Sequence, residues 1–361
     1  MAGMNSILSR LTRTWRAVAA AALPGSHDAA GSPVHVLDPE ARIRLDDGLL
    51  AIERPDQKPL RLRLPEILSV SIHGRASITT PTVHALLAEG IPVIWRSQSG
   101  YYLGQTLDLS RQQAPVRRAQ YAAQDAPLAL GIARHLVAAK LQNMHALLRR
   151  RVADSARIAT ASTALTQLAA RAQYASGIDA LRGLEGSGSA SYFGCWPDLL
   201  KGKAAAMGFP GRQRRPPVGP VNALLSYNYA VLAGHCGAAA LGAGLDPTEG
   251  FMHVARAGRP SLALDLLEPF RSAVADSAAL FALNTGEIAA ADFAEDETGT
   301  RLDPAGRKKA LGALERRLDE SFGDGAGGQV TYRAAIDRLA HSVARAVVTG
   351  SADALVIPIR P

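Results

Sequence analysis

Short segments in which apolar and polar residues alternate occupy the chain between residues 34 and 108. Alternation with a period of two is typical of strands that bury one face. Turn signals at Asp46-Asp47-Gly48 and Pro55-Asp56 separate the segments. The pattern predicts a domain of small antiparallel strands with one helix at 80–87, where Pro81 lies in the first turn. The expected strands cover residues 34–38, 41–45, 49–54, 60–64, 68–74, 91–95 and 100–105.

Beyond residue 115 the strand pattern stops and apolar positions recur with helical spacing. The expected helices cover residues 115–151, 153–174, 188–207, 220–243, 261–283, 306–319 and 331–348. The predicted fold class is α+β, with a small β-rich N-terminal domain over 34–108 followed by a larger all-α domain over 109–361. Residues 111–115 are the candidate linker.

The first 33 residues do not fit either pattern. Arg10, Arg13 and Arg16 precede an apolar stretch at 17–23, an order that faintly resembles a signal peptide. The apolar stretch is mostly alanine, so we expect a short amphipathic or disordered arm instead. Residues 24–33, PGSHDAAGSP, have the composition of a linker. We therefore expect 1–33 to be a flexible N-terminal extension.

Composition adds a basic, arginine-rich surface to this picture. The chain has 361 residues, of which 47% are hydrophobic, enough for a globular protein with two domains. Its formal net charge is +8, and all but six of its 40 basic residues are arginine. Because guanidinium groups match phosphate oxygens, this balance favours an anionic partner, with nucleic acid first. Part of the arginine excess could instead come from a GC-rich genome, because such genomes raise arginine and alanine together.

Several classes of protein are disfavoured by the same sequence. No apolar run is long enough to span a bilayer. The two cysteines, Cys195 and Cys236, form no CxxC pair, which argues against a disulfide framework or a thiolate zinc site. His235 precedes Cys236, but neighbours on a helix point apart, so we interpret both as core residues. We expect a cytoplasmic protein with no membrane partner.

Candidate chemistry is concentrated at 250–271, GFMHVARAGRPSLALDLLEPFR. Ser261 follows a turn and stands where a helix N-cap is expected. Asp265 and Glu268 are three residues apart, which places both carboxylates on one helix face. Acids among leucines are costly unless they are paired or bind a cation, and His253 could complete a divalent metal's shell. Arg271 could instead simply pair with Glu268.

A second acidic candidate is Glu185, which Gly183 and Gly186 flank. Glycines permit positive φ, so a turn just before the helix predicted at 188 could point this carboxylate into a cleft. The alternative is an ordinary acid at a helix start, where the helix dipole favours negative charge.

Basic and polar side chains in the helical region are candidates for DNA binding, although any one of them could equally lie on a solvated face. Arg212, Arg214 and Arg215 form a basic loop before the helix at 220–243. The full set is Lys140, Asn143, Arg212, Arg214, Arg215, Asn222, Tyr227 and Arg259.

Three segments in order resemble a known family: GLEGxxxxxYFxxW at 183–196, PVNALLSY at 220–227, and 250–271. With Lys140 and Asn143, the turn at 78–81 and the strands after it, this ordered set resembles the CRISPR adaptation integrases, the nuclease-integrases of spacer acquisition. The resemblance covers about residues 34–350.

The resemblance implies a β-rich N-terminal domain that dimerises and an α-helical catalytic domain. It implies a metal site made by Glu185, His253 and Glu268, which are also the catalytic residues, with Asp265 beside them. Oxygen and nitrogen ligands without thiolate suit Mg²⁺ or Mn²⁺. The implied activity is that of a metal-dependent DNA endonuclease and integrase, which inserts short fragments into a CRISPR repeat array by 3′-OH transesterification.

The implied partners are double-stranded DNA fragments, CRISPR repeat DNA, a second copy of the chain in a homodimer, and a small ferredoxin-like adaptation protein. Two other functions stay open from the residues alone. One is a metal-dependent nuclease without integration activity, and the other is a non-catalytic nucleic-acid-binding scaffold.

Overall fold

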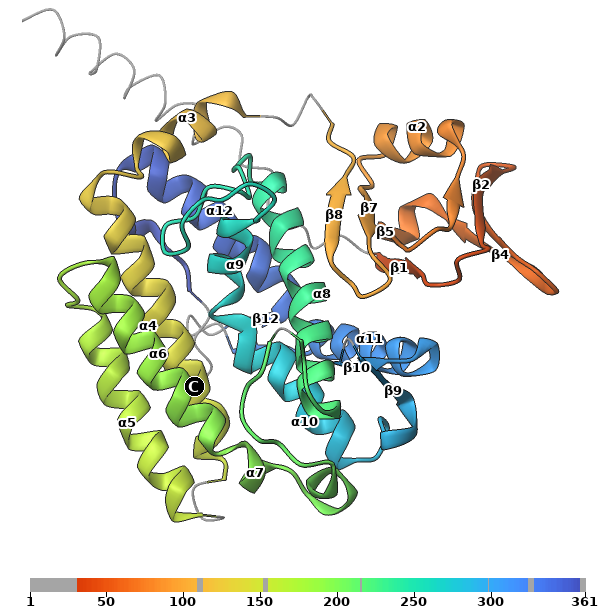
Figure 1. Ribbon diagram of the computed structural model, residues 1–361. Coiled ribbons are helices and arrows are strands. Elements are labelled where there is room, and N and C mark those ends of the chain that lie inside the picture. Colours follow the sequence, from red (N-terminus) through yellow and green to blue (C-terminus); the bar gives the residue numbers. More distant parts are fainter. Residues whose placement is uncertain are drawn as a thin grey trace, which may run out of the picture.

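The chain forms a β-rich region followed by a larger helical region, as the sequence predicts (Figure 1). The structure, a computed structural model, describes residues 31–108, 113–151, 155–214, 216–297, 299–323 and 328–357. The first 30 residues of the expected extension, residues 111–112 of the expected linker, and Arg215 lie outside these ranges. In the part that is described, no helix is both long and apolar enough to cross a membrane.

Two four-stranded sheets and one helix build the β-rich region. The first sheet has the order β1-β5-β7-β8 and the second has the order β4-β3-β2-β6. Their elements are β1 (Ser32–Val36), β2 (Arg42–Asp46), β3 (Leu49–Arg54), β4 (Gln57–Arg63), β5 (Ile67–His73), β6 (Ser77–Ile78), α2 (Thr80–Ala88), β7 (Val93–Arg96) and β8 (Tyr102–Gln105). Apolar side chains such as Ile43, Leu50, Ile72 and Leu86 fill the core of this region.

The turns of this region are as predicted, but the expectation of a purely antiparallel arrangement is wrong. Asp47, Gly48 and Asp56 all have positive φ, and the strands on either side of them pair antiparallel. In contrast, β1 pairs parallel with β5, β5 with β7, and β2 with β6. Alternation shows that a strand has a buried face, but it does not show which strand lies beside it. That choice is made by crossover connections such as α2.

The helical region is larger. Its helices and strands are α3 (Ala114–Ala122), α4 (Pro127–Arg149), α5 (Ala156–Ala172), α6 (Ile178–Gly194), α7 (Trp196–Leu199), α8 (Pro220–Gly242), α9 (Ser261–Leu267), a π-helical segment (Arg271–Asp276), α10 (Ser277–Asn284), β9 (Phe293–Asp296), β10 (Gly299–Leu302), α11 (Pro304–Asp319), β11 (Ser321–Gly323), β12 (Gln329–Thr331) and α12 (Tyr332–Thr349). In Figure 1, α4, α5 and α6 form one side of this region and α8 runs through its middle.

Four details of the helix prediction are wrong. The helix expected at 188–207 begins earlier, at Ile178, and ends at Gly194, and α7 follows as a separate short helix with Pro197 in its first turn. The helix expected at 115–151 is two helices, because Pro127 begins α4 after a turn. The helix expected at 261–283 ends at Leu267 and resumes as the π-helical segment, because Pro269 cannot continue the hydrogen-bond ladder. The strand pattern also returns in two short hairpins, β9–β10 and β11–β12, whose strands of three or four residues are too short to show a period.

Glu185 lies within α6, not on a turn before a helix. The helix runs through Gly183 and Gly186, and neither has positive φ. Both glycines are exposed, whereas Gly188 is buried where α6 crosses α4. A Cβ atom at Gly188 would lie 2.2 Å from Leu141 Cδ2. This packing of α6 outweighs the low helix propensity of glycine and brings Glu185 close to α4.

Polar side chains join the two regions. Arg96 on β7 is fully buried and donates a hydrogen bond to the carbonyl oxygen of Val231 on α8. His35 on β1 and His235 on α8 both approach Glu315 on α11. Burial lowers the pKa of His235 to about 4, so that this imidazole is neutral at pH 7. Two histidines and one paired carboxylate therefore meet at this junction.

Substitution by alanine should have opposite effects on stability at the buried and at the exposed glycines of α6. Gly188→Ala forces Leu141 to move in a closed core and should lower the free energy of unfolding by about 1–3 kcal/mol. Gly183→Ala adds a methyl group to open space on the same helix and should raise it by about 0.5–1 kcal/mol. Urea unfolding of both variants measures the difference, and equal shifts would contradict the close crossing of α4 and α6.

Candidate functional site

Four charged side chains from α4, α6, the end of α9 and the start of the π-helical segment meet inside the helical region. Lys140 is 1% exposed, and its ammonium contacts Glu185 Oε1 and lies 2.7 Å from Glu268 Oε2. Arg271 donates a hydrogen bond of 2.7 Å to the other oxygen of Glu268. The pairing of Arg271 with Glu268, which the sequence left as an alternative, is therefore confirmed. Two acids and two bases therefore balance one another; Lys140, Glu268 and Arg271 are buried and Glu185 is partly exposed.

The pKa values of the two acids follow from these contacts. Burial by itself raises the pKa of Glu268, but the charges of Arg271 and Lys140 outweigh it and lower this pKa to about 2. For Glu185, burial and the charge of Glu268 raise the pKa, while Lys140 and a hydrogen bond from Ser189 lower it, and the net shift is downward. Both carboxylates are therefore ionised at neutral pH.

His253 lies on the loop before α9, and Asp265 fixes both the loop and the imidazole. Asp265 accepts backbone hydrogen bonds from Phe251, Met252 and His253, and its Oδ1 lies 2.5 Å from His253 Nδ1. Because a carboxylate oxygen only accepts, Nδ1 donates in this contact, and Nε2 is the ring nitrogen that remains for another partner. The orientation of His253 is thus set by a carboxylate that is itself fully buried.

Side chains that the sequence did not single out hold the same loop from outside. Gln120 on α3 is fully buried and donates hydrogen bonds to the carbonyl oxygens of Asp246 and Glu249. Arg182 on α6 donates to the carbonyl oxygen of Met252. Gly250 is required because a Cβ atom there would lie 2.7 Å from Asp265 Oδ2. Ser261 begins α9, but its hydroxyl bonds the carbonyl oxygen of Val254, so it is not the predicted N-cap.

The donor set fits a hard divalent metal ion. Two carboxylates already converge on a buried cation, the Lys140 ammonium, and the free Nε2 of His253 adds one nitrogen. Asp265 has both oxygens engaged and therefore acts on His253, not as a free ligand. Among the residues that the structure describes, the only group with all three ligand atoms within 4.8 Å of one another is His35, His235 and Glu315. Glu185, Glu268 and His253 do not meet this distance criterion. Instead, Lys140 Nζ contacts the carboxylates of both Glu185 and Glu268.

The π-helical segment links this charge cluster to a second buried acid that the sequence analysis missed. Asp276 ends the segment and accepts hydrogen bonds from the hydroxyls of Tyr192 and Tyr229. Arg271 and Arg212 lie over the ring of Tyr229. The sequence signal was weak, because Asp276 stands between alanine and serine without a motif, and the wider spacing of a π turn cannot be recognised from periodicity.

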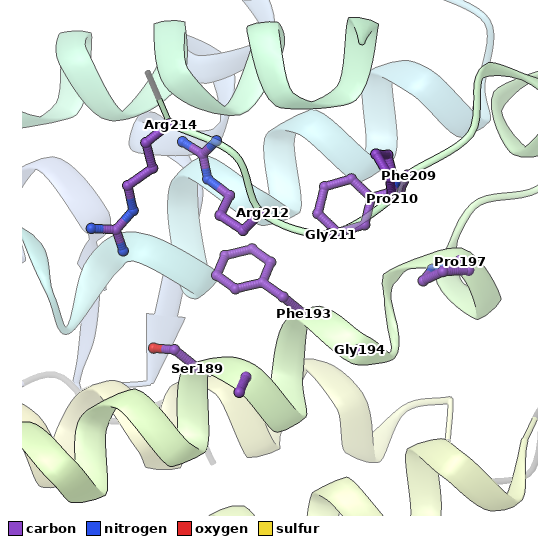
Figure 2. Close-up of a pocket in the computed structure, with 10 residues that line it drawn as sticks. Ser189, Phe193, Gly194, Pro197, Phe209, Pro210, Gly211, Arg212 and Arg214 are labelled. Atoms are coloured by element: carbon purple, nitrogen blue, oxygen red, sulfur yellow. The ribbon is translucent and has the colours of Figure 1, made fainter. Parts of the chain in front are cut away.

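A cavity of about 600 Å³ opens next to Glu185. Its wall includes Ser189, whose hydroxyl donates to Glu185 Oε1, together with Phe193, Phe209 and Arg212. Figure 2 shows Phe193 on α6 facing the loop that carries Arg212, with Arg214 beside it. The cavity therefore has aromatic and cationic walls at the edge of the acidic centre.

The other side chains predicted to bind DNA do not all lie on an open surface. Lys140 and Asn143 are buried, and Asn143 donates to the carbonyl oxygen of Pro269. Asn222 is buried and bonds the basic loop through Arg212 and the carbonyl oxygens of Gly211 and Val218. Tyr227 is buried next to Gly100, at the β-rich region. Arg214 is exposed, Arg259 is half-buried on the loop after His253, and Arg215 lies outside the described residues.

Comparisons with known proteins agree on one family. The family model for "CRISPR associated protein Cas1" matches residues 34–316. A "CRISPR-associated exonuclease Cas4/endonuclease Cas1 fusion" of Rhodospirillum rubrum is 43% identical over 294 residues, which are 80% of this chain and 50% of that protein. A "CRISPR-associated endonuclease Cas1 3" of Thermus thermophilus is 38% identical over 291 residues, which are 80% of this chain and 85% of that protein. The chain therefore spans about half the length of the fusion relative.

The fold of this chain is also similar to that of a solved structure. A chain of the "Cas6-RT-Cas1--Cas2 complex" has a TM-score of 0.76 and 25% sequence identity, and the match covers 93% of this chain and 37% of that chain.

Asp276 predicts a distinct pH dependence. Burial raises its pKa to about 6, although hydrogen bonds from Tyr229 and Tyr192 oppose the shift. A raised pKa means that the folded protein holds this proton between about pH 4 and pH 6 while the unfolded chain does not. The stability that the proton confers is therefore lost as pH rises through 6.

Asp276→Asn removes this titration. The free energy of unfolding of Asp276→Asn, relative to that of the unaltered protein, should rise by up to about 3 kcal/mol between pH 4 and pH 7. The reason is that the pKa of Asp276 is about 6 in the folded protein, against 3.8 for an ordinary aspartate. Denaturant unfolding at both pH values measures this difference. A difference that does not change with pH would show that Asp276 is ionised throughout.

Proposed function

Because the chain belongs to the family of CRISPR-associated Cas1 proteins, we propose that it is a metal-dependent DNA endonuclease and integrase that inserts short DNA fragments into a CRISPR repeat array. The observation that carries the proposal is the convergence of Glu185 and Glu268 on one buried cation beside an oriented His253. This is a donor set for Mg²⁺ or Mn²⁺ at the edge of an arginine-lined cavity.

The chain's own side chains prepare the site. Glu185, Glu268 and His253 Nε2 would hold the ion, and Asp265 would keep His253 in the coordinating tautomer. When bound, the ion would supply a Lewis acid that promotes deprotonation of the attacking hydroxyl and offsets charge on the reacting phosphate. Lys140 and Arg271 keep both acids ionised, so that their oxygens are ready to act as ligands.

The proposed reaction is an exchange of phosphodiester bonds. The 3′ oxygen of a DNA fragment forms a bond to a phosphorus atom of the repeat, while the bond from that phosphorus to the target strand's own 3′ oxygen breaks. The attacking hydroxyl gives its proton to solvent and the departing oxygen takes one up, so atoms and charge balance. With water as the nucleophile, the same exchange is hydrolysis, which accounts for endonuclease activity.

The cavity beside Glu185 is the proposed path of the DNA strand. Arg212 and Arg214 present guanidinium groups that suit phosphate oxygens, and Phe193 and Phe209 give the wall an apolar face for a base or sugar. Asn222 acts indirectly, since it holds Arg212 and the loop in place. These contacts bind the backbone without reading its sequence.

His253→Ala is the sharpest test of this site. It should abolish Mn²⁺-dependent cleavage and the joining of a labelled 3′-OH fragment to a plasmid, since it removes a ligand without disturbing the four-charge cluster. Circular dichroism should be unchanged, and His84→Ala, an exposed histidine on α2, is the control. Full activity of His253→Ala would end the proposal and favour a non-catalytic scaffold. Cleavage without joining by the unaltered protein would favour a plain nuclease.

Assembly follows from the chemistry. One site joins one fragment end to one strand, and an insertion needs two joins on antiparallel strands, which a two-fold dimer provides. We propose the β-rich region as the dimer surface, since Leu60 on edge strand β4 and Leu103 on edge strand β8 are 45% and 67% exposed. The similar solved complex carries Cas2 in its name, and we propose a small ferredoxin-like protein of that kind as the partner that spaces two dimers.

The isolated protein should therefore be a dimer at micromolar concentration, and insertion of both fragment ends should require the partner. Sedimentation velocity measures the first and an assay for paired joins measures the second. Leu103→Asp should shift the protein towards monomer, with Val356→Asp, an exposed apolar residue near the C-terminus, as the control. A strict monomer that inserts both ends alone would overturn this assembly.

A further inference from the structure

The second cluster of possible metal ligands lies where the β-rich region meets the helical region. His35 comes from β1, His235 from α8 and Glu315 from α11, so three elements far apart in the sequence contribute one ligand each. His35 Nε2 lies 3.1 Å and His235 Nε2 lies 3.0 Å from the same oxygen, Glu315 Oε1. No residue of this cluster belongs to the proposed catalytic site.

The distances match those between ligands that share one ion. In a tetrahedral zinc site with bonds of about 2.0–2.1 Å, neighbouring ligand atoms are roughly 3.3 Å apart. His235 Nε2 makes a hydrogen bond to Glu315, but His35 Nε2 is buried at a similar distance without a hydrogen-bond partner. A buried nitrogen that faces a carboxylate without bonding it is an unmet polar group, which a cation would satisfy.

The groups behind the three ligands are those that orient a metal site. His35 Nδ1 lies 3.1 Å from His73 Nε2, which can accept a hydrogen bond from Nδ1–H while His35 Nε2 binds a metal. Arg333 donates a hydrogen bond of 2.7 Å to the second oxygen of Glu315, Oε2, and leaves Oε1 for the ion. Arg333 also pairs with Asp319, so its positive charge is shared between two acids.

We propose that His35, His235 and Glu315 bind a divalent transition-metal ion of the zinc class, which fixes the β-rich region to α8 and α11. Two imidazoles and one carboxylate suit zinc better than Mg²⁺, which prefers oxygen. An imidazole can hold a ring proton on Nδ1 while Nε2 binds the ion. The site is structural: it joins two regions of the fold and is separate from the catalytic donors.

The test uses the full chain carrying His253→Ala, which weakens the proposed catalytic site. Titration with Zn²⁺ by calorimetry should give one ion per chain at micromolar affinity or better, and Co²⁺ should show the visible absorption of a low-coordinate site. Further substitution of His35→Ala or Glu315→Gln should weaken binding at least tenfold, whereas His135→Ala, an exposed histidine on α4, should not.

Hydrogen exchange gives a second readout that does not depend on activity. Zn²⁺ should slow exchange of the β1 amides in the His253→Ala protein and not in the His35→Ala, His253→Ala protein. Circular dichroism checks that each variant folds. Absence of saturable Zn²⁺ binding, or binding that is unchanged by both His35→Ala and Glu315→Gln, would overturn the site. Either result leaves the proposed DNA chemistry untouched, because that rests on different residues.

Discussion

The mutual neutralisation of three buried charges and one half-buried carboxylate is the constraint on which the helical region depends. Lys140 lies on α4, Glu185 on α6, Glu268 directly after α9 and Arg271 at the start of the π-helical segment. A buried charge is costly without a partner of opposite charge. Desolvation of two carboxylates is tolerated because two cations contact them. Removing one member would leave an uncompensated charge, so the elements that supply these residues must pack together.

The same constraint explains the irregular backbone around the site. Pro269 breaks the helix after Glu268, and its carbonyl oxygen, which no regular helix would satisfy, accepts a hydrogen bond from Asn143. The π-helical turn that follows directs Arg271 towards Glu268 and Asp276 towards two tyrosines. Irregular helix geometry of this kind is frequent at functional sites because it places side chains that a straight helix would turn away.

Polar networks also control the site from a distance. Asp265 fixes His253, Gln120 fixes the loop that leads to it, and Asn222 fixes the loop that carries Arg212. Each of these side chains is buried and bonds backbone atoms of a loop, so both loops acquire defined positions. The junction of the two regions uses the same principle, with Glu315 between histidines and Arg333.

The sequence by itself determined the division into a β-rich and a helical region, most strand and helix positions, and the residue types of the acidic site. Those properties follow from local periodicity, from prolines at helix starts, and from the order of the motifs along the chain. The pairing of β1, β5 and β7, the burial of Lys140 and Asn143, and the roles of Asp276 and Gln120 were decided only by the tertiary structure. The same holds for Glu185, which a helix places at the site although its flanking glycines predict a turn. The physical reason is that a charged or polar residue is equally compatible with solvent and with a buried partner. The partner comes from an element far away in the sequence, as with Gln120 and Asp246, which are 126 residues apart.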